Sequence, residues 1–88
     1  MLRIREYRED SNTLRLRLDG TISQTSLADL ENACSRHRAS REMILLDMGG
    51  VVFMNNEVAN RIVRLRSEQL RIINCSPFIE ALLNTVAT

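Results

Sequence analysis

The sequence has 88 residues, of which 44% are hydrophobic and 26% are charged, and its formal net charge is +1. This size and composition are typical of one small globular domain, so we expect a single domain over residues 1–88 and exclude a second. The basic and acidic residues number 12 and 11, a balance that argues against a protein that binds nucleic acid through bulk positive charge.

The cysteines, the histidine and the apolar runs exclude several kinds of site. Cys34 and Cys75 lie far apart in the sequence, and His37 has no partner at the spacing of a metal site. We therefore expect no metal, no cofactor and no Cys–His catalytic pair. The apolar runs are too short to cross a membrane, and the first residues do not form a signal peptide. These features predict a cytoplasmic protein without membrane insertion.

An antiparallel hairpin is predicted at the start of the chain. Leucine and isoleucine alternate with arginine around residues 2–7 and 14–18, and a period of two is typical of half-buried strands. Residues 9–12 between them are turn formers. With the apolar side chains facing the core, four arginines share the opposite face and form a possible cationic patch. This patch consists of Arg3, Arg5, Arg15 and Arg17.

A helix is predicted over residues 26–38, where apolar side chains recur at helical spacing. Ser26 is expected to cap its first turn, and Asp29 is expected to interact favourably with the positive end of the helix dipole. Near the other end, His37 is expected to bond to the last carbonyl groups.

The central strand is predicted over residues 43–48, which are apolar except for Asp47 and are followed by Gly49 and Gly50. A carboxylate inside a buried strand can be catalytic, because burial shifts its pKa. However, no second carboxylate, histidine or lysine is predicted at a strand end beside it. We therefore favour a hydrogen-bonded structural role for Asp47.

A second helix follows, which Asn55 or Asn56 is expected to cap and which is expected to end near Ser67. Glu57 and Arg61 are spaced to form an ion pair on its outer side. Its inner side is an apolar stripe, as in a helix that packs on a sheet. The stripe consists of Val58, Ile62 and Leu65.

The last two predicted elements are a strand over residues 70–75 and a helix with Ser76 as its cap and Pro77 in its first turn. The side chains expected to face inward from this helix are Phe78, Ile79, Leu82, Leu83 and Val86. The complete order is ββαβαβα. Because strand and helix alternate after the hairpin, we predict an α/β fold with a four-stranded mixed sheet and helices mainly on one face.

Residues 45–54, read as Leu-Leu-Asp-Met-Gly-Gly-Val-Val-Phe-Met, resemble the signature of STAS domains, the fold of bacterial anti-sigma-factor antagonists. In that family a hydrophobic strand leads into Asp-Leu-Ser-Gly-Val, and Phe-Met/Ile-Asp-Ser-Ser/Thr-Gly then starts a helix. Residues 14–20 resemble the family's strand that ends in glycine, and residues 73–77 resemble its last strand and Ser-Pro helix start. The resemblance covers almost the full chain and implies a single STAS-like domain.

The phosphorylation motif of the family is degenerate in this chain. Asn55 falls on the family's aspartate, Asn56 on its first serine and Glu57 on its phosphorylated serine or threonine. The resemblance therefore implies that the chain is not phosphorylated at the usual site. Three interpretations of these residues stay open: an ordinary helix start, a partner contact, or a glutamate that mimics the phosphorylated state with one negative charge.

The resemblance implies a non-enzymatic protein-interaction module, similar to an anti-sigma-factor antagonist, in bacterial signal transduction and transcription regulation. Its partner would be an anti-sigma factor, a serine-kinase-like protein or another component of a signalling or transport complex. The partner would dock across the surface of residues 52–64, where the candidate binding residues are Asn55, Asn56, Glu57, Asn60, Arg61 and Arg64. Because the sequence has no glycine-rich phosphate loop and no nucleophile paired with a base, we expect no enzyme activity.

The alternative function is a structural subunit or a homo-oligomerising scaffold of a bacterial signalling or transport complex. Helices on one face would leave the other face of the sheet open, with Ile73 and Met43 or Leu45 beside the arginines. The cationic patch could bind phosphates, acidic lipid or an acidic protein, or it could be a solvated face that discourages edge pairing. Tyr7 is the only large aromatic residue near the patch, which argues against nucleic acid.

Overall fold

The chain folds as four strands and three helices in the predicted order ββαβαβα. The computed structural model describes residues 1–87. The strands are β1 (Leu2–Asp10), β2 (Thr13–Ile22), β3 (Met43–Met54) and β4 (Leu70–Ile73), and the helices are α1 (Gln24–Ala39), α2 (Asn56–Val63) and α3 (Pro77–Ala87). None of the helices within residues 1–87 has the length and apolar character needed to span a bilayer.

The strands form one mixed sheet in the order β1-β2-β3-β4. The pair β1–β2 is antiparallel because only a tight turn joins the two strands, and there the Asn12 backbone N–H donates to Asp10 Oδ1 at 2.8 Å. The pairs β2–β3 and β3–β4 are parallel, with a helix crossing between their strands. The predicted α/β class and mixed sheet are thus confirmed.

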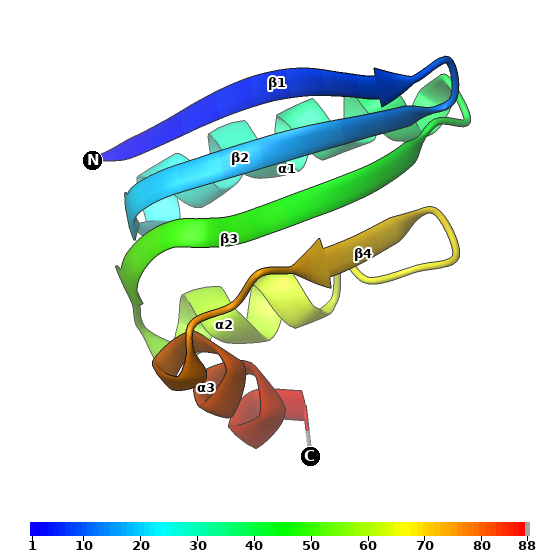
Figure 1. The fold of residues 1–88 in the computed structure, drawn as a ribbon. Helices are drawn as coiled ribbons and strands as arrows, with labels where there is room; N and C mark the ends of the chain where they lie inside the picture. Colours follow the sequence, from blue (N-terminus) through cyan, green and yellow to red (C-terminus); the bar gives the residue numbers. More distant parts are fainter. Residues whose placement is uncertain (88) are drawn as a thin grey trace.

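Helices α1 and α2 lie behind the sheet in Figure 1, and α3 packs against α2. Alternate residues of β2 and β3 point toward these helices and are fully or almost fully buried. They include Leu14, Leu16, Leu18, Ile44, Leu46 and Met48. The intervening residues of both strands face the open side of the sheet, and this side carries the cationic patch.

The central strand is longer than predicted, because β3 runs through Gly49 and Gly50 to Met54. Its neighbour β2 also continues to Ile22, so the ladder of paired residues extends beyond the glycines with two shifts in register. At Gly50 a Cβ atom would collide with the carboxylate of Asp19, and the glycine therefore permits the close approach of the two strands.

Three predicted helix and strand limits were wrong. The N-cap of α1 is Ser23, whose Oγ accepts from the Ser26 backbone N–H at 3.2 Å, so the first turn contains no acidic residue. Helix α2 ends at Val63, and the backbone turns before Ser67. Strand β4 ends at Ile73, because the next residue has a left-handed φ of 60° that an extended strand does not allow.

The end of α1 and the start of α3 also correct two side-chain predictions. His37 contacts carboxylates of Glu42 and Glu6, at 3.2 and 3.5 Å, and does not use its ring to bond to the helix carbonyls. The Ser76 cap is confirmed, since its Oγ accepts from the Ile79 backbone N–H at 3.3 Å. Phe78 is 54% exposed and does not face inward.

Candidate functional site

The predicted partner-binding residues lie along the outer side of α2 and at its N-terminus. Asn55 is the N-cap, and its Oδ1 accepts from the Val58 backbone N–H at 2.9 Å, as predicted. The inner side of the helix is buried through Val58, Ala59 and Ile62. Of the six predicted residues, Asn60 is partly buried and the other five are exposed.

The predicted ion pair between Glu57 and Arg61 is absent, because both side chains contact the neighbouring helix α1. Arg61 Nη2 donates to both carboxylate oxygens of Glu31, at 2.7 and 2.9 Å. Gln24 Nε2 donates to Glu57 Oε2. Arg61 thus pairs with Glu31 of α1 and not with Glu57, which lies one turn away on the same helix. These contacts are exposed, so we expect each to contribute little to stability.

The end of β3 carries an exposed apolar cluster, which joins two residues of the predicted docking segment 52–64 to Phe78, a residue that the sequence reasoning placed in the core. Val52, Phe53 and Phe78 are 68%, 51% and 54% exposed. The rings of Phe53 and Phe78 stack with centroids 6.5 Å apart and an interplanar angle of 17°. Since Asn55 follows directly in the chain, the apolar cluster adjoins the start of α2.

The sequence contained a signal for the position of Phe78. The inward stripe of α3 is already complete without it, at spacings of three, one and three residues: Ile79, Leu82, Leu83 and Val86. Phe78 immediately precedes this stripe and therefore falls outside the core-facing arc of the helix. No comparable signal marks Phe53, because the register shift between β2 and β3 interrupts the alternation there.

The four arginines of the cationic patch share the open face of the sheet, as predicted. In the β1–β2 ladder Arg3 lies opposite Asp19, and Arg5 lies opposite Arg17. Together with Tyr7 and Arg15, these residues line a shallow pocket of about 500 Å³. We call it the arginine pocket. Its lining residues are Arg3, Arg5, Tyr7, Arg15, Arg17 and Asp19.

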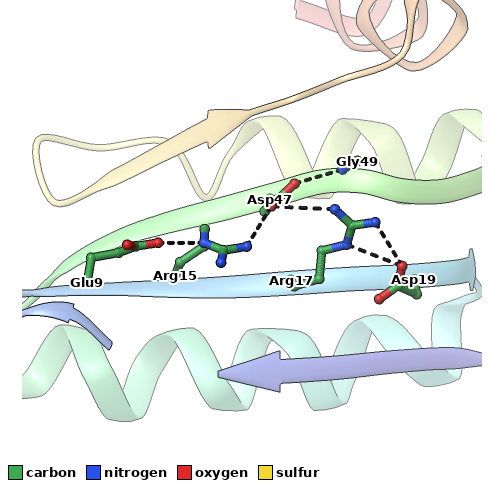
Figure 2. A network of polar contacts seen from close by, with 6 residues as sticks. All are labelled: Glu9, Arg15, Arg17, Asp19, Asp47 and Gly49. Atoms are coloured by element: carbon green, nitrogen blue, oxygen red, sulfur yellow. Dashed lines mark hydrogen bonds and ion pairs between the residues drawn. The ribbon is translucent and has the colours of Figure 1, made fainter. Parts of the chain in front are cut away.

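A single buried carboxylate on β3 holds the two arginines of β2 (Figure 2). Asp47 is 2% exposed, and its Oδ2 lies 2.9 Å from Arg15 Nη1 and 3.7 Å from Arg17 Nη1. Its Oδ1 accepts from the Gly49 backbone N–H at 2.9 Å. The structural role predicted for Asp47 is therefore to anchor both Arg15 and Arg17.

The pKa of Asp47 is held below its ordinary value of 3.8 despite burial. Burial alone would raise the pKa, but hydrogen bonds from the Gly49 backbone, Asn74 and Arg15, with the charge of Arg17, outweigh that effect. Asp47 is therefore ionised at neutral pH.

Outer carboxylates complete the network around the same two arginines. Glu9 Oε1 accepts from Arg15 Nε at 2.5 Å, and Asp19 Oδ1 accepts from both Nε and Nη2 of Arg17 at 3.2 Å. The guanidinium carbon of Arg15 also lies 4.5 Å from the centre of the Tyr7 ring. Each side chain of this pair is thus held from at least two directions, which fixes its position on the open face.

The thiols are poorly suited to nucleophilic chemistry. Burial raises the pKa of the Cys34 thiol to about 11 and also raises the pKa of Cys75. No group of three or more His, Cys, Asp or Glu side chains that could hold a metal ion occurs within residues 1–87.

No family model matches the chain, and a search of the curated proteins finds no match. The resemblance to STAS domains therefore stands on residues 45–54 and on the order of the neighbouring segments. What the chain does must be argued from its two exposed features, the apolar cluster beside α2 and the arginine pocket on the open face.

Proposed function

We propose that the chain is a non-enzymatic interaction module, similar to a STAS-type anti-sigma-factor antagonist, that docks a regulatory protein through the end of β3 and helix α2. The observation that carries this proposal is the stacked, half-exposed pair of Phe53 and Phe78 next to the start of α2. The sequence has only three aromatic residues, and two of them are exposed side by side here.

The arrangement of apolar and polar residues is that of a protein interface. Interfaces place aromatic anchors near the centre and polar or charged residues around the rim. We define the docking surface as the apolar cluster Val52, Phe53 and Phe78 together with Asn55, Asn56, Glu57, Asn60, Arg61 and Arg64. The apolar cluster supplies the anchors, and the exposed asparagines and charges of α2 supply the rim.

Glu57 supports a docking surface that carries its negative charge without modification. Its carboxylate accepts a hydrogen bond from Gln24 and lies in the first turn of α2, where the helix dipole favours an anion. A phosphate would bring about −1.5 to −2 charges at the same place. The proposed partner, of the anti-sigma-factor or serine-kinase type, would therefore meet a fixed charge that a kinase cannot add or remove.

The non-enzymatic part of the proposal is supported by the ionisation state of the buried carboxylate of Asp47. Asp47 has a lowered pKa and contacts two arginines, so it is a poor proton donor or acceptor near neutral pH. A general acid or base needs a pKa close to the working pH.

The alternative function, a structural subunit or oligomerising scaffold, would use the open face of the sheet. Met43, Leu45 and Ile73 are half-buried there, beside the arginines, as the sequence suggested. The most exposed large hydrophobic side chains apart from Met1 lie in the docking surface instead. We favour docking over assembly for that reason.

The proposal is tested by capture of cytosolic proteins from the source cell on the immobilised chain, read by quantitative mass spectrometry. We expect Phe53→Ser and Arg64→Glu each to deplete the same regulatory protein from the captured set. Arg64 is exposed and makes no ion pair within residues 1–87, so its reversal should leave folding intact. The matched control is Arg3→Glu, the same charge reversal on the open face.

Two results would contradict docking through α2. One is depletion by Arg3→Glu while Arg64→Glu and Phe53→Ser retain the partner, which would assign the working surface to the open face. The other is a stable oligomer in light scattering that Arg3→Glu dissociates, which would support the scaffold function.

A further inference from the structure

We propose that the arginine pocket is a binding site for a phosphate group, carried by a small phosphomonoester. It lies on the open face over β1 and β2, outside the docking surface, and the inference does not depend on the proposed function. Four guanidinium groups line a concavity of about 500 Å³, a size that suits a small ligand. Guanidinium groups recognise phosphate oxygens through paired N–H donors.

Two of the four arginines have no hydrogen-bond or ion-pair partner within residues 1–87. Arg3 and Arg5 are exposed and form no ion pair or side-chain hydrogen bond within residues 1–87. Each guanidinium therefore keeps all of its N–H donors for a ligand. On the same β1 strand the helix-facing arginine is different, because Arg8 pairs with Glu42. The unpaired donors are thus confined to the side of β1 that faces the pocket.

The position of Arg5 favours a bound anion beside it. It lies directly opposite Arg17 in the antiparallel ladder, and like charges at opposite positions of a β-ladder destabilise it. Asp19 and Asp47 partly offset the charge of Arg17, but no carboxylate of residues 1–87 pairs with Arg5. A bound phosphate between the two guanidinium groups would convert the repulsion into attraction.

The other two arginines are already fixed in place. Asp47 holds both from below, Glu9 takes Nε of Arg15, and Asp19 takes Nε and Nη2 of Arg17. These contacts leave Nη2 of Arg15 available for a ligand. Donors that are positioned before binding lose less conformational freedom when the ligand arrives. The site thus combines a preorganised wall on β2 with two free arginines on β1.

The charge of the open face suits an anion. Its arginines outnumber its carboxylates. Arg71 on β4 adds to this excess, because it pairs with Leu45 in register and joins the same face. The cations are Arg3, Arg5, Arg15, Arg17 and Arg71, and the anions are Glu9, Asp19 and Asp47. A phosphomonoester, with about −1.5 to −2 charges near neutral pH, complements this excess.

The single aromatic residue favours a small ligand over single-stranded nucleic acid. Bases are bound by stacking on free aromatic faces, and several are needed along a strand. Here Arg15 covers one face of the Tyr7 ring at 4.5 Å. The arginine pocket therefore recognises only the phosphate group of its ligand. A soluble phosphomonoester and a phosphatidic acid headgroup both provide this group.

The test is calorimetric titration and thermal unfolding of the chain with inorganic phosphate and with O-phosphoserine, at constant ionic strength, with chloride as the reference anion. We expect saturable binding and a rise in the unfolding temperature for both phosphates. Arg5→Gln should weaken binding by about tenfold or more, because it removes charge-assisted hydrogen bonds. The matched control is Arg38→Gln on α1, which removes an exposed arginine from the other side of the sheet and should bind like the unchanged chain.

Stability without phosphate gives a second, independent measurement. Arg5→Gln should raise the unfolding temperature in chloride, because it removes the repulsion with Arg17, while it lowers the gain on adding phosphate. A variant that merely damaged the fold would lower both. If circular dichroism shows that Arg5→Gln is misfolded, Arg3→Gln is the second variant for the same titration.

Vesicles of phosphatidylcholine with and without phosphatidic acid separate the two sources of phosphate. Sedimentation only with phosphatidic acid, displaced by O-phosphoserine, assigns the site to a lipid headgroup. Saturable binding of O-phosphoserine without sedimentation assigns it to a soluble phosphomonoester. The proposal is overturned if phosphate stabilises the chain no more than chloride does, or if Arg5→Gln and Arg38→Gln weaken binding equally.

Discussion

The docking surface and the arginine pocket differ in what holds their side chains. In the pocket, Asp47 fixes two arginines from within the sheet, and the free donors point at a space of about 500 Å³. On the docking surface, Phe53 and Phe78 contact each other and are more than half exposed. The first region is organised by buried electrostatics, and the second is apolar surface that the fold leaves uncovered.

This difference indicates which kind of partner each region suits. Preorganised charged donors favour a ligand with a defined geometry, such as a phosphate group. Exposed aromatic rings favour a larger surface that can cover them and exclude water. The two regions lie on different elements, the pocket on β1 and β2 and the docking surface on the end of β3, α2 and α3. The following variants test this contrast, in order of the expected loss of stability.

Leu46→Ala should reduce the free energy of unfolding most, by about 2–5 kcal/mol. Leu46 is 0% exposed and belongs to the core between the sheet and its helices. Its neighbour Leu45 points to the open face and is only partly buried, so Leu45→Ala should lose clearly less. Urea unfolding measures both. The contrast between the two faces requires that the helix-covered face dominates stability. Equal losses for the two variants would contradict this.

Asp47→Asn should reduce the free energy of unfolding by about 1–3 kcal/mol at pH 7, less than for a fully buried pair because both arginines are partly exposed. The amide still accepts from the Gly49 backbone, but Arg15 and Arg17 lose their shared negative partner. The control is Asp19→Asn, which removes a partly exposed carboxylate beside Arg17 and should lose less, about 0.5 kcal/mol.

The pH dependence of this difference follows from the lowered pKa of Asp47. A carboxylate with a folded pKa below its unfolded value stabilises the fold above the unfolded value and loses that effect as the pH falls through the folded value. The gap in stability between the unchanged chain and Asp47→Asn should therefore be full above pH 3.8 and narrow at lower pH. Urea unfolding from pH 7 down to pH 3 measures it, and a gap that widens on acidification would contradict the anchor role.

The sequence predicted the parts of these regions that follow from periodicity. Alternation in β1 and β2 was enough to place the four arginines on one face, because a strand turns its side chains to opposite sides in strict order. It did not predict that Asp47 joins Arg15 to Arg17, since that contact depends on the register between β2 and β3. The length of β3 was also not predicted. Gly49 and Gly50 suggest the end of the strand, but β3 continues past them because β2 continues beside it.

The docking surface was predicted less completely. The cap Asn55 and the exposed side of α2 follow from local sequence, and both are confirmed. The partners of Glu57 and Arg61 on α1 lie 33 and 30 residues away from them in the chain, and no local rule relates them. Phe53 and Phe78 are brought together only by the packing of α3 beside the end of β3.

Arg61→Gln should have the smallest effect, a loss of about 0.2–1 kcal/mol. Its two hydrogen bonds to Glu31 are short, but the arginine is 57% exposed and the contact is screened by solvent and salt. The loss should therefore shrink between 0.05 M and 1 M NaCl in urea unfolding, whereas the loss from Leu46→Ala, which reports burial, should not shrink with it. If the Arg61→Gln loss persists unchanged at high salt, the contact with Glu31 is a packing interaction, and α2 is held on α1 by more than charge. The docking surface would then be as preorganised as the arginine pocket, and the contrast between the two regions would fail at this helix.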